Sequence, residues 1–198
     1  MLITPTTKIE SVNSMLSAVG EAPITNLDED LAEAQIAVSI LDEVSREVQS
    51  QGWTWNTERK RKFIISSNGE ILLPVNTLKV EAVHETSGLP DRSKRFTMRD
   101  RKLFDLVNHT YVFTKDQFID RVYGLAFPDL TESARRFITL DATTRYMTNV
   151  LGADADLQQV QQQAQRSWVQ LNWEEDSMSD NNMMTDEPLM SYTVERLL

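Results

Sequence analysis

Histidine and cysteine supply many of the metal ligands and nucleophiles of enzymes, and this sequence is poor in both. It contains no cysteine, which removes thiolate nucleophiles, disulfides and cysteine-held metal sites. Its only histidines are His84 and His109. They do not have the spacing of a metal-binding pair, two histidines four residues apart on one helix. We therefore expect no metal site and no cofactor.

Carboxylates are abundant, with 30 Asp and Glu residues, so a pair that could act as general acid and base is no signal by itself. The runs Asp28-Glu29-Asp30 and Glu174-Glu175-Asp176 are typical of helix ends or solvated clusters. The sequence has no phosphate-binding loop, dinucleotide fingerprint or nucleophile elbow. These features predict a protein that is not an enzyme and has no catalytic residues.

Two clusters of basic residues are the stronger functional signal. The first is Arg59-Lys60-Arg61-Lys62, and the second consists of Arg92, Lys94, Arg95, Arg99, Arg101 and Lys102. Three interpretations remain open: docking on an acidic partner protein, contact with DNA phosphates, or solvated strand ends whose charges protect an edge. The candidate residues for docking on a partner protein are Arg59, Lys60, Arg61, Lys62, Arg95, Arg99 and Arg101. Trp53 and Trp55 would share one face of a strand, either as an anchor in the core or as an interface hot spot.

Apolar residues recur every three or four positions in four segments, which predicts helices over 7–19, 30–50, 131–151 and 154–175. Thr7 with Glu10 forms a capping-box pattern, and Thr131 or Ser133 is expected to cap the third helix. Between the second and third helices the period changes to two. The strands expected there are Trp53–Thr57, Lys62–Ser66, Glu70–Leu73, Leu78–His84, Arg95–Met98, Leu103–Val107, Thr110–Phe113 and Phe118–Tyr123, arranged as an antiparallel meander.

The predicted fold class is α+β: a four-helix bundle with an inserted antiparallel β region and an extended C-terminal arm. The bundle comprises residues 1–52 and 128–175, the β module 53–127, and the arm 176–198. The net charge of -10 divides along the same lines: residues 52–127 carry +4, and residues 1–51 and 128–198 carry -7 each. Such a division favours different neighbours at the two ends of the molecule.

The arm is acidic and polar but too rich in apolar residues for a solvated tail, so we expect it to order on a partner. Its candidate docking residues are Met183, Met184, Leu189, Met190, Tyr192, Leu197 and Leu198. We expect no signal peptide and no membrane-spanning segment.

A family resemblance is carried by Val12-Asn13-x-x-Leu16, Gly20-Glu21-x-Pro23, Leu27 and Gln49-Ser50-x-Gly52-Trp53-Thr54-x-Asn56. These residues resemble the N-terminal half of the tail tubular protein A family, the head-to-tail adaptors of podoviruses, which are short-tailed bacteriophages. The block from Ser133 through Gly152-Ala153 is similar to that family's third helix. The β region resembles the family only in position and length, and the C-terminal tail departs from it.

The resemblance implies a structural subunit of the virion tail, assembled in the host cytoplasm into a ring of twelve copies. Its partners would be the portal protein, the nozzle (tubular protein B), the tail fibres and further copies of itself. Double-stranded DNA would pass through the lumen without specific binding. Two rivals stay open: a tail-associated hydrolase of cell-surface polysaccharide or peptidoglycan, and a DNA-binding module that uses the basic β loops.

Overall fold

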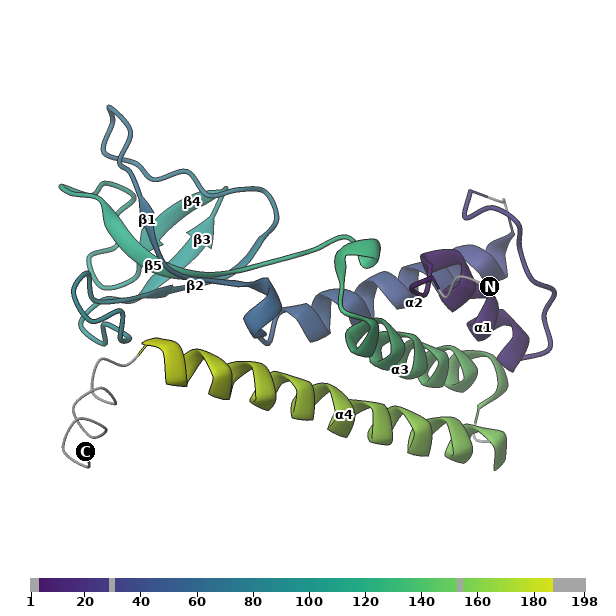
Figure 1. The fold of residues 1–198 in the computed structure, drawn as a ribbon. Coiled ribbons are helices and arrows are strands. Elements are labelled where there is room, and N and C mark those ends of the chain that lie inside the picture. Colours follow the sequence, from purple (N-terminus) through teal and green to yellow (C-terminus); the bar gives the residue numbers. More distant parts are fainter. Residues whose placement is uncertain (1–3, 29–30, 153–154, 187–198) are drawn as a thin grey trace, which may run out of the picture. The chain divides into compact units, whose positions relative to one another are not determined.

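The computed structural model describes residues 4–28, 31–152 and 155–186, and its fold class is α+β (Figure 1). The chain forms two compact units. The helical unit comprises Met1–Leu41 and Thr131–Leu198, and the β unit comprises Asp42–Leu130. The boundary between them falls inside one continuous helix, α2.

The helical unit contains α1 (Lys8–Ala18), the first part of α2 (Ala32–Gln49), α3 (Glu132–Leu151) and α4 (Ala155–Asp186). The capping box predicted at Thr7 and Glu10 is confirmed. The cap of α3 is Thr131, whose hydroxyl accepts a hydrogen bond from the Ala134 N–H, and α3 ends at Gly152 with a φ of 73°. Short-range signals therefore set these helix ends.

Helix α3 is the centre of the helical unit, because it packs against α1 on one side and α4 on another (Figure 1). Its buried residues include Ile138, Ala142 and Tyr146, and the Tyr146 hydroxyl donates to the Glu33 carbonyl of α2 at 3.4 Å. Burial raises the pKa of the Tyr146 phenol above its ordinary value, so this hydroxyl stays protonated and able to donate.

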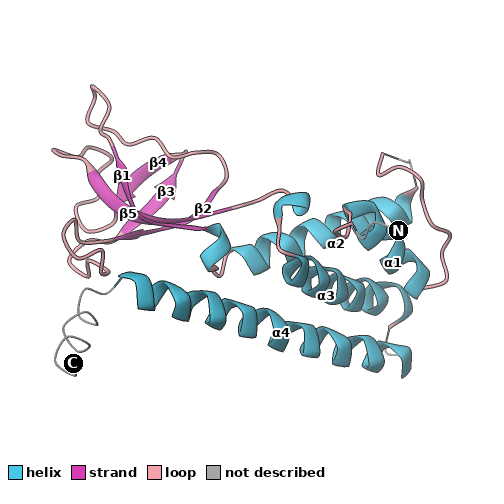
Figure 2. Ribbon diagram, viewed as in Figure 1, coloured by secondary structure: helices cyan, strands magenta, loops and turns pink. Residues whose placement is uncertain are grey.

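The β unit begins with the end of α2 and a 3-10 turn, η1 (Thr54–Asn56). Its five strands are β1 (Thr57–Phe63), β2 (Thr77–Ala82), β3 (Phe96–Arg99), β4 (Lys102–Asp105) and β5 (Gln117–Tyr123) (Figure 2). One antiparallel sheet has the order β1-β5-β2, and β3 and β4 form a separate hairpin. A second 3-10 turn, η2 (Phe127–Asp129), ends the unit. The core of the unit consists of Ile71, Leu73, Val80, Ala82, Phe96, Leu103, Phe113 and Ile119.

Several predicted strands are wrong. The segment 53–57 is a turn rather than a strand, because the Asn56 side chain accepts from the Trp53 backbone N–H at 2.8 Å and closes it. The segments 70–73 and 110–113 contribute only isolated bridges. The sheet is not a meander, since β5 lies between β1 and β2 and buries Ile119 and Arg121 from its centre.

The C-terminal segment also differs from the prediction. An arm without regular structure was expected from Asp176, but α4 continues to Asp186, so residues 176–186 are helical. The acidic cluster Glu174-Glu175-Asp176 therefore lies inside α4, and the Glu174 carboxylate accepts a hydrogen bond from the Ser133 hydroxyl of α3. Residues 187–198 lie outside the described residues.

Candidate docking surface

The first basic cluster forms a bulge on the edge strand β1. The register with β5 shifts between Glu58 and Arg61, and Lys60 has a φ of 50°. The Lys60 backbone N–H donates to Asp120 at 2.6 Å, and its ammonium donates to the Thr86 carbonyl at 2.9 Å. A bulge of this kind twists an edge strand and prevents it from pairing with another chain.

The other basic side chains of this cluster differ in whether their charge is paired with a carboxylate. Arg61 forms an ion pair with Glu58 at 2.9 Å, and Lys62 forms one with Asp116 at 3.1 Å. Arg59 is exposed and has no ion-pair partner among the described residues. Arg59 is therefore the member of this cluster whose charge is most available to another molecule.

The second cluster spans the β3–β4 hairpin and the loop before it. The hairpin turns at Asp100-Arg101, with φ values of 50° and 59°, as a two-residue hairpin turn requires. The Arg99 guanidinium lies 4.1 Å from the centre of the Phe104 ring. Lys102 pairs with Glu70 at 2.9 Å, and this hydrogen bond raises the pKa of the Lys102 ammonium. Arg101 remains exposed and has no ion-pair partner in the described ranges.

Three residues of the loop before β3, Arg92, Lys94 and Arg95, line a groove of about 430 Å³. Its wall includes Phe96 and Leu106, and its other side is β2 from Val80 to Ala82. A smaller adjoining groove shares Val80 and Glu81 and is lined by Arg59 and Lys79. The structure thus brings Arg59 of the first cluster and Arg95 of the second to adjoining grooves, whereas Arg99 and Arg101 line neither.

A buried carboxylate holds the loop that presents these cations. Asp91 accepts hydrogen bonds from the Ser93 hydroxyl at 2.6 Å and the Ser93 N–H at 3.1 Å, and it lies 3.3 Å from the Lys94 ammonium. The bonds from Ser93 lower the pKa of Asp91 to about 2. Asp91 and Lys94 form an ion pair. The guanidinium groups of Arg92 and Arg95 are exposed and have no ion-pair partners among the described residues.

This arrangement has the chemistry of a docking surface. Exposed guanidinium groups beside apolar residues can hold the carboxylates of an acidic partner. Wherever the pKa of a described Asp or Glu is shifted, it is lowered, as for Glu10, Asp91, Asp105 and Asp116. A glycosidase needs a carboxylic acid whose pKa is raised. No set of three or more His, Asp or Glu side chains able to hold a metal occurs in the described ranges.

Two of the residues that carry the family resemblance, Gln49 and Asn56, form a separate cluster in the β unit together with the segment 123–125, here called the basal clamp. The Gln49 amide accepts from the Leu125 N–H at 2.7 Å and donates to the Leu125 carbonyl at 3.2 Å. The Asn56 amide donates to the carbonyls of Gln49 at 2.8 Å and Tyr123 at 3.1 Å. The clamp joins the end of α2 to the end of β5.

Trp53 lies in the same region. Of the two expected roles, an anchor in the core or an interface hot spot, its burial supports the anchor in the core. Its ring is buried, its indole N–H donates to the Val48 carbonyl at 2.7 Å, and it stacks on Trp55 with ring centres 6.1 Å apart. Gly52 has a φ of 86°, and a Cβ there would lie 2.9 Å from a methyl of Val122. The motif Gln49 to Asn56 is therefore a folding motif.

The other part of the resemblance is also structural. Val12 and Leu16 are buried on α1, and the Asn13 amide makes two hydrogen bonds to the backbone of Ile24, at 2.8 and 3.0 Å. These bonds fix the loop that follows α1. Sequence reasoning recognised the pattern without its physical basis, which is the pairing of one side-chain amide with one backbone residue.

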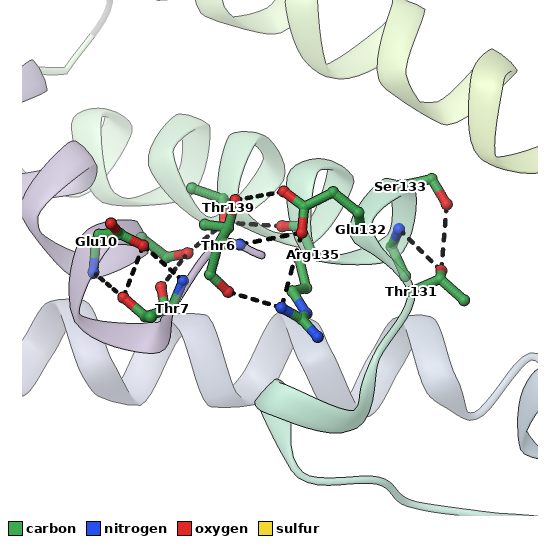
Figure 3. Close-up of polar contacts among 10 residues, drawn as sticks. Thr6, Thr7, Glu10, Thr131, Glu132, Ser133, Arg135 and Thr139 are labelled. Carbon is green, nitrogen blue, oxygen red and sulfur yellow. Dashed lines mark hydrogen bonds and ion pairs between the residues drawn. The ribbon is translucent and has the colours of Figure 1, made fainter. Parts of the chain in front are cut away.

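A polar cluster between α1 and α3 was not predicted (Figure 3). Arg135 is buried, and its guanidinium donates to the Thr6 carbonyl at 3.0 Å. Glu132 accepts from the N–H and the hydroxyl of Thr6. The Thr139 hydroxyl lies 2.9 Å from the Ser11 hydroxyl. These bonds tie the residues before α1 to α3, and the only sequence signal was the position of Arg135 on the buried face of its helix.

The predicted arm residues lie mostly beyond the described part of the chain. Met183 and Met184 fall in the last turns of α4, where side chains are not described. Leu189, Met190, Tyr192, Leu197 and Leu198 lie outside the described residues. Sequence reasoning missed that Val169 and Trp173 are both exposed on α4. A helical projection centred on the buried Leu171 would have placed both on the opposite face.

Comparison with known proteins agrees with these structural roles. No helix in the described ranges is both long and apolar enough to cross a membrane. The family model described as tail tubular protein matches residues 9–182. The chain is similar to tail tubular protein A of Klebsiella phage KP34, with 26% identity over 159 residues, covering 80% of this chain and 81% of that protein. The chain belongs to the tail tubular protein family, whose members are structural components of phage tails.

Proposed function

We propose that this chain is the head-to-tail adaptor of a short-tailed phage, a structural subunit that forms a ring around the DNA channel. In this proposal the ring has twelve copies, with the portal protein on one side and the tail nozzle, tubular protein B, on the other. Tail fibres attach at the periphery. Assembly takes place in the host cytoplasm, and the chain catalyses no reaction.

The observation that carries the proposal is a set of exposed arginines on the β unit that have no ion-pair partner in the described ranges: Arg59, Arg92, Arg95 and Arg101. They stand on a protein of net charge -10. With the boundaries of the structure, the helical unit carries -11 and the β unit +1. Surfaces of such different charge fit different neighbours, so the β unit meets the nozzle and the fibres.

The portal then contacts the helical part of the chain. In the proposal, residues 1–52 and 128–175 act as a four-helix bundle that carries the β module 53–127, and the segment 176–198 completes the portal contact. The apolar residues of that segment, Met183 and Leu189 among them, become buried against the portal. The helix from 176 to 186 supports this role, because it supplies a preformed element for docking.

Transport of DNA through the ring sets a further requirement. A lumen that bound phosphates strongly would hold the genome, because each Lys or Arg contact with DNA releases counterions and adds affinity. A strongly acidic helical unit fits a lumen through which DNA slides. We therefore expect no specific DNA binding by the isolated protein at physiological salt.

Two experiments test the two ends of the proposal in phage particles that depend on the chain supplied in trans. Truncation after Met178 should leave DNA-filled heads without bound adaptor, as measured by electron microscopy and protein composition. Full occupancy of the truncated chain on heads would contradict a role of the segment in portal docking.

Arg95→Glu should leave the chain on the heads but reduce bound nozzle and fibres several-fold. Lys115→Glu makes the same change of charge at an exposed lysine that lines neither groove, so it serves as the matched control. Equal nozzle occupancy in the two variants would contradict docking through the groove.

A further inference from the structure

The outward face of α4 exposes an unusual combination of side chains. Trp173 is 79% exposed and Val169 is 59% exposed. They lie four residues apart, so they are neighbours on one face of the helix. The opposite face packs on α3 through Leu157, Ala164 and Leu171, and the Trp168 ring contacts Phe137 with centres 4.8 Å apart. This part of α4 is therefore apolar on two sides, and α3 covers one of them.

The same stretch is nearly free of charge. From residue 157 to residue 173 the only charged residue is Arg166, in a chain of which 25% is charged. At about 3.6 residues per turn, Gln158, Gln162 and Gln165 fall on the outward face with Val169 and Trp173. A solvated helix face in this protein would carry several charges. Depletion of charge with an exposed tryptophan is the composition of a protein interface.

Charge also indicates the occupant. The helical unit carries -11, so two copies repel each other wherever their acidic surfaces meet. The outward face of α4 is a stretch where copies can approach without burying like charges. The one charge between residues 157 and 173, Arg166, is positive and exposed and has no ion-pair partner among the described residues, which favours an acidic neighbour. A second copy of this chain is such a neighbour.

The helical unit also has a surface that can receive this face. Leu31, which directly precedes α2, and Ile36, in its first turns, are both about half exposed, and Glu33 between them in the sequence is also exposed. Helix α3 lies between α4 and this part of α2 (Figure 1). The two apolar surfaces therefore belong to helices that lie on opposite sides of α3 (Figure 1). Surfaces arranged in this way join copies head to tail, and such contacts form a ring when the rotation closes.

We propose that the outward face of α4, formed by Gln158, Gln162, Gln165, Val169 and Trp173, docks on a second copy of the chain at the surface of Leu31 and Ile36. This inference rests on the proposed ring and names the faces that form it. Arg166 pairs with the acidic surface around Glu33. Trp173 is the anchor of the contact, since a tryptophan that loses its exposed area contributes more than any other residue of this face.

The absence of cysteine makes a direct test possible. Phage particles are assembled with the double variant Ile36→Cys, Val169→Cys and treated with a short thiol-specific cross-linker. We expect a ladder of covalent multimers of this chain, because the thiol introduced at position 169 of each copy joins the thiol at position 36 of the next. Either single variant should give no ladder. The pair Ser14→Cys, Val169→Cys is the matched control, since Ser14 is exposed on α1 of the same unit.

Three results would overturn the inference: cross-linking of the position 169 thiol to a different protein, cross-linking within one chain, or full labelling of that thiol by a maleimide dye in intact particles. If the ring is visible between head and nozzle while the thiol at position 169 is labelled, the inference fails and the proposed function stands. If the chain is absent from that position in the particle, both fail.

A second variant separates docking from folding. Trp173→Glu should abolish ring formation but leave the circular dichroism and thermal unfolding of the isolated chain unchanged, because the side chain is exposed. Trp173→Phe should retain rings. Normal rings from Trp173→Glu would also overturn the inference.

Discussion

Replacement of Asn56 by alanine should be among the most damaging single changes in the β unit. The Asn56 side chain is fully buried and makes three hydrogen bonds, all to backbone groups: it accepts from Trp53 and donates to Gln49 and Tyr123. Asn56→Ala leaves these groups without their partner. Each unsatisfied buried group costs about 1–3 kcal/mol, and part of this is recovered by relaxation. We expect the free energy of unfolding to fall by about 3–5 kcal/mol.

The matched control is Asn76→Ala. Asn76 is exposed, and its amide makes a single hydrogen bond to the neighbouring carbonyl of Gly124 at 3.0 Å. That change should cost about 0.5–1 kcal/mol. Urea unfolding followed by tryptophan fluorescence measures both, because Trp53 and Trp55 lie beside the clamp. At a slope of about 2 kcal/mol per molar urea, the midpoint for Asn56→Ala should fall by roughly 1.5–2.5 M. Equal midpoints for the two variants would refute the clamp as a source of stability.

Three further predictions concern other features. Gly52→Ala should lower the free energy of unfolding by about 1–3 kcal/mol in the same urea assay, because φ is 86° and the added methyl would meet Val122 at 2.9 Å; an unchanged midpoint would contradict this. Thr7→Ala should cost about 1 kcal/mol of stability in thermal unfolding through loss of the cap, whereas Thr4→Ala, at an exposed position before the helix, should cost little. Asp91 has a folded pKa of about 2, below its ordinary 3.8, so its ionised form adds stability that is complete above pH 3.8 and is lost as pH falls through 2. The melting temperature of Asp91→Asn should therefore lie below that of the natural protein at pH 6 and approach it towards pH 2, and a constant difference over that range would be inconsistent with this account.

Local signals predicted the helices well. The apolar period and the capping box at Thr7 depend on residues close in sequence, and the structure confirms them. The strands were less predictable. Whether Trp53 to Thr57 extends or turns depends on the Asn56 side chain. The central position of β5 depends on pairing between residues far apart in the sequence, such as Thr57 with Val122 and Val80 with Arg121. A period of two carries no information about strand order.

The candidate docking surface was likewise predictable only where it depends on residues close in sequence. The basic residues were found from their clustering, but sequence could not tell which of them would be free. Arg61 and Lys62 have partners in Glu58 and Asp116, and only the fold brings the latter close to Lys62. The Trp173 face was missed because an exposed tryptophan and a buried one follow the same helical period. A helical projection separates them only after the buried side is known.

The basal clamp has a consequence for how this protein can change. The polypeptide enters β1 and leaves β5 at two adjacent points that are bonded to each other, since Gln49 and Asn56 hold residues 123–125. Because these two points are adjacent, the number of residues between them does not change the distance that the chain must span there. Surface loops between them, such as the segment from Thr86 to Pro90, can lengthen at small entropic cost. Changes of length or sequence between those points can therefore leave the helices of the chain untouched.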